Sequence, residues 1–343
     1  MKKLILLLSV LSLLLISACN SDSLLLNDLS SDKEQFVEVV NVGEGIDVET
    51  YNAIANTVKD VRQGKVKLNE SQIKEIQSLI HKYGLFDLIE VAFPDEDLEI
   101  VTLKSGMKVR KKDDFYVIGD ILYTEEQIYE FYGNGESDNP GEIGLRASFT
   151  NKSSLLWPGN IVFYHLSTSM SSDTRQAALD AMAHWSSVSA VQFQAKGLYT
   201  PDYINFINGS GSYSQLGRVG GAQNLSLDAS LADKGTALHE IAHAIGMHHE
   251  HQKYNRDSYI TVHFNYIKPD TEIVAQFTKV ANNTSIYSVI FDSQSITCYG
   301  SYNAAGVYPN VATMTGTNGT STWTAQRNAP SYSDLQLVSC FYY

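Results

Sequence analysis

Residues 239–250 read HEIAHAIGMHHE. Residues four apart on a helix lie one above the other, so His239 and His243 can present their rings to a single metal ion. Gly246 can adopt the left-handed conformation that ends a helix, which turns the chain and brings His249 round as a third ligand. The spacing therefore predicts one zinc ion per chain, held by three histidines, with a fourth position open for water.

Glu240 follows the first expected ligand and can reach a water on the metal without binding the metal itself. This is the position of the general base in zinc proteases. Two other interpretations are a surface helix rich in histidine and a structural zinc site without chemistry. The glycine and the third histidine, at the offsets that the longer protease motif requires, favour the catalytic site. The spacing of His248 from His239 and His243 does not suit a ligand of the same metal ion. We expect His251 to face solvent.

The N-terminus has the pattern of an export signal. Lys2 and Lys3 precede an apolar run over residues 4–16, which is too short for a stable membrane span. The following residues, ISAC, end at Cys19 and resemble a bacterial lipobox. We therefore expect an exported protein, either secreted or anchored to a membrane by a lipid on Cys19. An ordinary signal peptide with an incidental cysteine is the alternative.

The charge and the cysteine content exclude two classes of protein, those that bind nucleic acid through a basic surface and those held together by many disulfides. The formal net charge is −13, and the acidic excess lies within residues 20–146, so no basic surface is available for nucleic acid. Beyond Cys19 only Cys298 and Cys340 remain, which excludes a disulfide framework. One bridge between them and two free thiols are both compatible with the sequence.

A chain of 343 residues is long enough for two folding units. Residues 20 to about 50 are polar and acidic, which is typical of a tether. One helix is expected to end at Gly64, and a second starts at Asn69, which can cap it together with Gln72. Residues 99–122 alternate like short strands around a charged turn at 108–114.

Glycine and proline between 131 and 151 indicate an exposed linker. We divide the chain into a signal peptide (1–19), a tether and pro-region (20–146) and a catalytic domain (147–343).

The catalytic domain begins with a strand at 161–166, followed by a helix that Ser171 or Ser172 caps. Further strands are expected at 191–193 and 203–207. The glycine-rich residues 216–223 are expected to form a bulged edge strand, with the motif helix starting near residue 233. Beyond residue 257 the periodicity is weak, which predicts an irregular second lobe.

Further motifs outside the histidine stretch give a family resemblance. They are DYINF (202–206), GRVGGAQ (217–223), NRDSYI (255–260), Trp157-Pro158 and Ser333-Asp334. Over about residues 155–343 the chain resembles the astacin family of metzincin zinc endopeptidases. The resemblance implies an α+β fold: a two-lobed protease domain with a twisted sheet, an active-site helix and an irregular C-terminal lobe, after a small α+β pro-region.

Carried over position by position, the resemblance implies that His239, His243 and His249 bind Zn²⁺ and that Glu240 is the base. It implies that Glu250 anchors the mature N-terminus through a buried charge pair. Tyr299 would be the tyrosine that can ligate the resting zinc and then support the transition state.

The segment SITCYG (295–300) departs from the family pattern in its middle. Thr297 stands where a methionine lies beneath the metal, and Cys298 stands where histidine is common. Since the methionine is a hydrophobic floor rather than a ligand, its loss should weaken packing by about 1 to 3 kcal/mol. The departure argues for a less stable site more than for an inactive one.

The pro-region carries a weaker resemblance. Residues 117–120 read VIGD, which keeps the Gly-Asp of the family's latency motif and lacks its phenylalanine. The resemblance implies that Asp120 blocks the zinc, the alternative being an ordinary turn aspartate. Cleavage near Arg146-Ala147 would suit the family's mature N-terminus.

The sequence therefore predicts a zinc metalloendopeptidase that hydrolyses peptide bonds in proteins and is made as a latent zymogen. The substrate would lie extended along the edge strand at 216–223. One alternative is a catalytically silent, surface-tethered binding module on the same scaffold, supported by the altered residue Thr297. Another is an adhesin or scaffold lipoprotein with a structural zinc.

Overall fold

The computed structural model describes residues 45–133, 153–281 and 290–343. The signal peptide with Cys19, most of the tether and the expected cleavage site at Arg146-Ala147 lie outside these residues. Among the described residues, no helix is long and apolar enough to cross a membrane.

Two helices open the described chain, and both were expected. The first, α2 (Val48–Arg62), is capped by Asp47. The second, α3 (Glu70–Tyr83), begins with the predicted capping box, in which the side chains of Asn69 and Gln72 each accept a hydrogen bond from the other's backbone N–H. It ends at Gly84, which has the left-handed φ of 66°.

Four short strands and a helix follow over residues 99–132. They are β1 (Glu99–Thr102), β2 (Lys108–Lys112), β3 (Phe115–Ile118), β4 (Ile121–Tyr123) and α4 (Glu125–Tyr132), and the strands pair antiparallel in chain order. The prediction of a turn over the whole of 108–114 was wrong. Most of that segment is β2, because Val109 is buried and the ammonium of Lys111 lies 5.2 Å from the centroid of the Tyr116 ring. The turn is confined to residues 113 and 114.

Residues 161–228, within the expected catalytic domain, contribute five strands to the same sheet. They are β5 (Ile161–Leu166), β6 (Gln192–Ala195), β7 (Tyr203–Gly209), β8 (Tyr213–Gln215) and β9 (Ala222–Asp228). The expected edge strand at 216–223 was misplaced. The edge of this domain is β8, antiparallel to β9, and the glycine-rich residues between them form a loop in which Gly217, Gly220 and Gly221 have positive φ.

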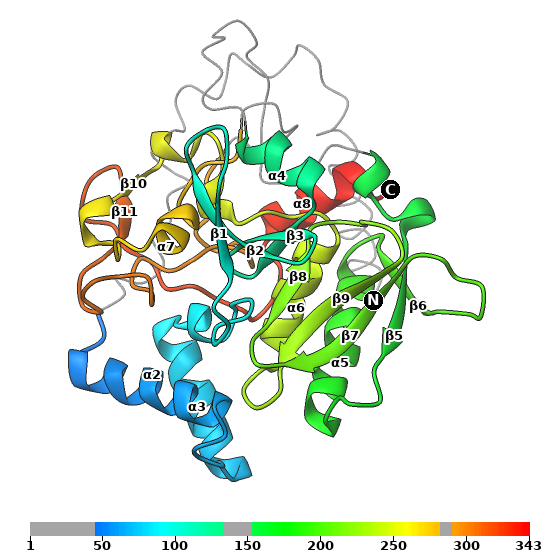
Figure 1. Cartoon of the computed structure of the whole chain (residues 1–343), viewed down its shortest axis with the longest axis horizontal. Coiled ribbons are helices and arrows are strands. Elements are labelled where there is room, and N and C mark those ends of the chain that lie inside the picture. The colour runs from blue at the N-terminus through cyan, green and yellow to red at the C-terminus, as the bar shows by residue number, and fades with distance from the viewer. Residues whose placement is uncertain (1–44, 134–152, 282–289) are drawn as a thin grey trace, which may run out of the picture.

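Strand β4 joins the four N-terminal strands to the other five in one sheet. The order is β1-β2-β3-β4-β8-β9-β7-β5-β6, with β4 parallel to β8 through the pairs Ile121–Ser214 and Leu122–Gln215 (Figure 1). Strand β4 therefore occupies the side of β8 that lies away from β9, next to residues 216–223, where the sequence predicted an extended substrate.

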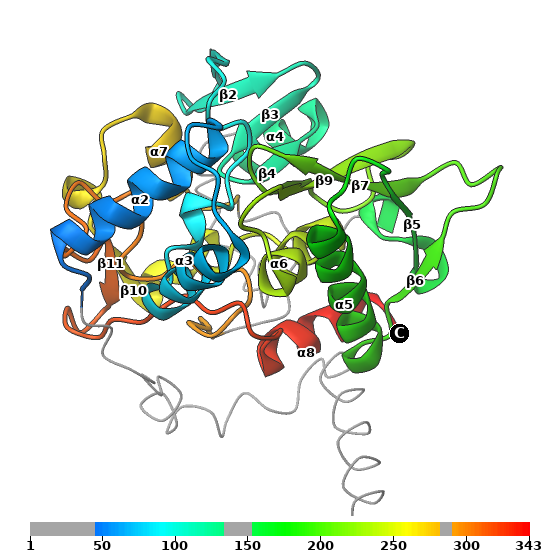
Figure 2. The same cartoon turned by 90° about the horizontal axis from the view of Figure 1, so that it is seen from below.

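Helices pack on one side of the sheet (Figure 2). They are α5 (Ser172–Val188), capped by Ser171 as expected, α6 (Lys234–Ala244) and the C-terminal α8 (Tyr332–Phe341). Their buried residues form one apolar core with β5, β7 and β9, and Trp157 ties the domain's start to it by donating from its indole N–H to the Ala244 carbonyl at 2.9 Å.

The C-terminal lobe is irregular, as predicted. Its regular elements are β10 (Ile260–Val262), α7 (Thr271–Ala275) and β11 (Met314–Gly316), with β10 and β11 paired antiparallel. Single 3₁₀ turns complete the described chain: η1 (Phe86–Leu88), η2 (Ser153–Leu155), η3 (Pro158–Asn160), η4 (Glu250–Gln252), η5 (Arg256–Ser258) and η6 (Phe264–Tyr266).

Candidate metal centre

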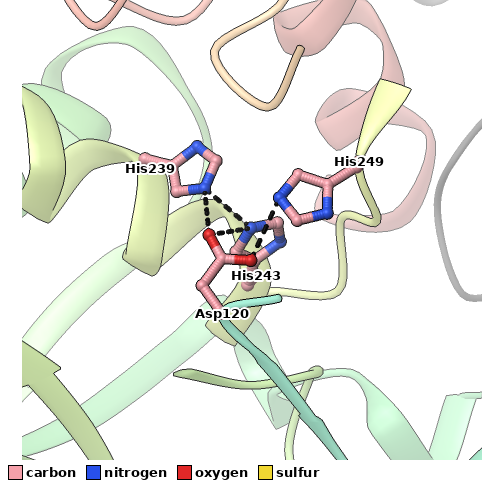
Figure 3. Close-up of side chains that lie close together, drawn as sticks. All are labelled: Asp120, His239, His243 and His249. Carbon is pink, nitrogen blue, oxygen red and sulfur yellow. Dashed lines mark hydrogen bonds and ion pairs between the residues drawn. The ribbon is translucent and has the colours of Figure 1, made fainter. Parts of the chain in front are cut away.

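Three histidines from the motif stretch converge on one point. Helix α6 starts at Asp233, whose side chain accepts from the backbone N–H of Thr236, and it carries His239 and His243 one turn apart. Gly246, at a φ of 115°, turns the chain so that His249 approaches the same point. One ligating atom from each of these three histidines and one from Asp120 all lie within 4.8 Å of one another (Figure 3).

Backbone carbonyls orient two of the rings. His239 donates from Nδ1 to the Ile296 carbonyl at 2.8 Å, and His243 donates from Nδ1 to the Met247 carbonyl at 2.6 Å. Such contacts fix the tautomer and leave Nε2 as the ligating atom. The two Nε2 atoms lie only 3.0 Å apart. Because facing lone pairs repel at that distance, the arrangement fits a cation between them, and its nitrogen-rich donors suit zinc.

Asp120, from the turn between β3 and β4, completes the cluster. Its Oδ2 lies 2.8 Å from Nε2 of His239, and its Oδ1 lies 3.1 Å from Nε2 of His249. Burial acts to raise its pKa, but the neighbouring His249 and the close contacts with the three histidine rings hold it well below the usual value. Gly119 beside it has a φ of 63°, and a Cβ there would lie 3.1 Å from the Tyr299 hydroxyl. A side chain at position 119 would therefore be strained and crowded, which explains why a glycine precedes Asp120 here.

Glu240 lies fully buried on α6 next to the first histidine. Neither of its carboxylate oxygens has a hydrogen-bond partner among the described residues. Burial, with the negative charges of Asp120 and Glu90, raises its pKa well above the usual value. A carboxyl group with a raised pKa and free oxygens is suited to accept and return a proton.

Tyr299 lies against the cluster without reaching it. Its ring centroid is 4.8 Å from that of His249, and its hydroxyl donates to Oε1 of Gln276 at 3.2 Å. The expectation that His251 faces solvent was wrong. Turn η4 folds this ring inward, where it is completely buried 4.3 Å from the Tyr299 ring and hydrogen-bonded to the Gln276 carbonyl.

Glu250 already has partners in this form of the chain. Its Oε1 accepts from Nζ of Lys253 at 2.9 Å and from the backbone N–H of Asp292 at 3.1 Å. A new N-terminus would therefore have to join or replace these contacts.

The unusual residues beneath the site have defined neighbours. Thr297 is buried, and its hydroxyl lies 3.1 Å from that of Ser295, which donates to Asp334 at 2.7 Å. A polar network therefore fills the space where the family has a methionine. Cys298 is a buried free thiol, so it does not pair with Cys340.

Sequence reasoning missed a buried ion pair beside the cluster. Arg327 donates to both carboxylate oxygens of Glu90, with Nη2–Oε2 at 2.8 Å. Oε2 of Glu90 lies 3.6 Å from Nε2 of His239. Burial raises the pKa of Glu90 to about 7, although Arg327 opposes that shift. The two residues are 237 positions apart, and no local pattern links them.

A twisted sheet, an active-site helix and a buried three-histidine cluster with an adjacent glutamate are the features of a zinc metallopeptidase. The model of the peptidase family Astacin matches residues 149–343. The chain belongs to this family. Zinc is the cofactor of the family, and the histidine cluster can hold a single metal ion.

Two curated relatives illustrate the extent of the similarity. The chain is 30% identical over 209 residues to Zinc metalloproteinase nas-31 of Caenorhabditis elegans, covering 60% of this chain and 34% of the relative. It is 34% identical over 149 residues to Astacin-like metalloprotease toxin 5 of Loxosceles gaucho, covering 43% and 78%. The chain spans between 34% and 51% of the length of three of its relatives.

A solved structure supports the fold. High choriolytic enzyme 1, a hatching enzyme zinc-protease from Oryzias latipes, is 26% identical and superimposes with a TM-score of 0.52. The match covers 57% of this chain and 98% of that chain.

Proposed function

We propose that this chain is an exported zinc metalloendopeptidase that hydrolyses peptide bonds in proteins and is made as a latent zymogen. The observation that carries the proposal is the convergence of His239, His243 and His249 beside the unpartnered carboxyl of Glu240. The three histidines are the proposed ligands of one zinc ion, and Glu240 is the proposed base.

A bound zinc ion would supply a Lewis acid that lowers the pKa of water and polarises a peptide carbonyl. Glu240 then accepts a proton from the attacking water and passes it to the leaving amine. Tyr299, released from Gln276, donates a hydrogen bond to the oxyanion that forms. The carbonyls of Ile296 and Met247 hold the histidine rings in place throughout.

Latency follows from three contacts that the pro-region makes. Asp120 fills the remaining position of the cluster, β4 occupies the edge of β8, and Glu90 neutralises the buried Arg327. Residues 20–146 are thus the proposed tether and pro-region, and residues 147–343 the catalytic domain. Cleavage near Arg146-Ala147 would release the block and give Glu250 a new N-terminus to bind.

Export rests on the N-terminal signal. Residues 1–19 would direct the chain out of the cytoplasm, and a lipid on Cys19 would anchor it to a membrane; secretion without an anchor is the alternative. The proposed partners are protein or peptide substrates, with no nucleic acid.

Metal-dependent cleavage tests the proposed function. The full chain, purified with zinc and activated by limited proteolysis near residue 146, should cleave a denatured protein substrate. A chelator should abolish cleavage, and added zinc should restore it. A folded, zinc-loaded and activated chain that cleaves nothing would instead favour the silent binding module, for which Thr297 is the supporting feature and the retained Glu240 the opposing one.

A further inference from the structure

His248 lies beside the metal cluster without belonging to it. Its side chain is fully buried, and its two closest ring neighbours both come from the pro-region. The Tyr123 ring stacks on it at 5.9 Å and 24°, and the Phe131 ring meets it edge-on at 4.6 Å. The Tyr123 hydroxyl lies 3.3 Å from Nδ1 of His248, within hydrogen-bonding distance. Nε2 of the same ring is buried and has no partner among the described residues.

Apolar residues of the proposed catalytic domain belong to the same buried cluster as Tyr123. Leu216 and Val280 are buried in the same apolar cluster as Tyr123 and Phe131. Backbone contacts hold the two parts together: Leu216 donates to the Leu122 carbonyl at 3.3 Å, and Ala281 donates to the Phe131 carbonyl at 2.8 Å. Removal of the pro-region would therefore uncover a surface of Leu216, His248 and Val280, which we name the Tyr123 site.

The chain places this site at a fixed distance from the metal cluster. Tyr123 is the third residue after Asp120, and β4 is extended through its pairing with β8. At about 3.3 Å per residue, the Tyr123 site is roughly 10 Å along the strand from the position of Asp120. A peptide bound to the same edge would therefore present to it a side chain about three residues from the reacting carbonyl.

We propose that Tyr123 stands in for a substrate side chain, and that Leu216, His248 and Val280 form a subsite for a tyrosine or phenylalanine of the peptide to be cleaved. This proposal rests on the proposed function and names a substrate feature that the metal cluster does not determine. The imidazole offers a face for stacking, the two aliphatic side chains add apolar surface, and Nδ1 can pair with a tyrosine hydroxyl. Charged side chains are disfavoured because they would lose water without gaining an ionic partner.

Peptide cleavage by the activated full chain tests the subsite. The probes are peptides with a single cleavable bond, in which one tyrosine is moved through the second to fourth positions on either side and compared with alanine there. We expect kcat/KM to rise roughly fivefold for tyrosine at the third position on one side, because an aromatic pair contributes about 1 kcal/mol beyond area burial. No preference for tyrosine at any position would overturn the proposal.

Two variants and a control assign the preference to His248. His248→Ala should bring the ratio of tyrosine to alanine peptides close to one. His248→Phe keeps a ring and should accept phenylalanine as well as tyrosine, which guards against a general effect of truncation. The matched control is His165→Ala, since His165 is an exposed histidine of β5 that bonds Asn205; it should keep the parent's ratio. An unchanged ratio in both His248 variants would refute the assignment.

A measurement of peptide binding without cleavage tests the subsite independently of the proposed peptidase activity. The anisotropy of labelled tyrosine and alanine peptides, measured on the activated Glu240→Gln variant, needs no turnover. Tighter binding of the tyrosine peptide supports the subsite even if the parent cleaves nothing, a result that would sink only the peptidase proposal. Equal binding of the two peptides overturns the subsite whether or not the parent is active.

Discussion

Oδ2 of Asp120 lies 2.8 Å from Nε2 of His239, although 119 residues separate the two in the chain. Asp120 ends the tight Ile118–Ile121 turn between β3 and β4, and β4 continues the catalytic sheet beside β8. The carboxylate is therefore held by strand pairing on one side and by three imidazoles on the other. The contact with the histidines and the pairing with β8 therefore come from one short segment of the chain.

Loss of the Asp120 carboxylate should weaken latency. We expect uncleaved Asp120→Ala protein to hydrolyse a small peptide at least tenfold faster than the uncleaved parent, because a charge-assisted contact to the cluster is worth about 1.5 to 3 kcal/mol. The control is Asp97→Ala, which alters an exposed aspartate of the same region. Equal rates for uncleaved parent and Asp120→Ala would contradict the latency role.

Removal of one partner of the Glu90–Arg327 pair should destabilise the precursor. Glu90→Ala leaves the Arg327 guanidinium buried without its carboxylate, which should lower the free energy of unfolding by about 3 to 5 kcal/mol. Denaturant titration of the uncleaved chain measures this loss. A change within about 0.5 kcal/mol, the range of ordinary surface substitutions, would mean that water or another group reaches Arg327.

Truncation of the Tyr299 hydroxyl should affect turnover more than binding. In the activated chain, Tyr299→Phe should reduce kcat by about 10²-fold, the usual cost of losing one oxyanion donor, with little change in KM. The ring contacts with His249 and His251 are kept in this variant, so zinc content should not fall. A variant with parental kcat would remove Tyr299 from the proposed mechanism.

Stability should depend on pH through Asp334. Burial raises its pKa to about 7, although hydrogen bonds from Ile296 and Ser295 oppose that shift. Because the folded-state pKa lies above the unfolded value, this contribution is complete below about pH 4 and is lost as the pH rises through 7. The free energy of unfolding should thus fall by an amount on the order of 3 to 4 kcal/mol over this window.

The variant Asp334→Asn isolates that contribution. It cannot ionise, so its unfolding free energy should vary less between pH 4 and 7 than that of the parent. Asp180→Asn, a change on the exposed face of α5, should keep the parental dependence. Parallel curves for the parent and Asp334→Asn would show that another group governs this window.

Local spacing was enough to predict the centre of the site. His239, His243 and Glu240 follow from helical periodicity, and Gly246 with His249 follows from the way a helix ends. The predicted capping box of Asn69 and Gln72 and the predicted cap at Ser171 are confirmed for the same reason, since each depends on residues a few positions apart.

The wrong predictions concern residues whose structure depends on contacts with distant parts of the chain. The β2 residues are charged yet form a strand, because their side chains lie over aromatic rings of other segments. His251 is polar yet buried, because Tyr299 and Gln276 arrive from distant positions to pack against it. The edge strand was misplaced because the glycine-rich loop resembles a bulged strand in composition.

The most direct test of the central claim combines metal content with turnover in parent and Glu240→Gln chains, both activated and purified with zinc. The account predicts one zinc per chain in each, since Glu240 is not a ligand, and cleavage of a denatured protein by the parent alone. Parental cleavage by Glu240→Gln, or a parent that cleaves without zinc, would contradict the assignment of the histidine cluster as a catalytic zinc site with Glu240 as its base.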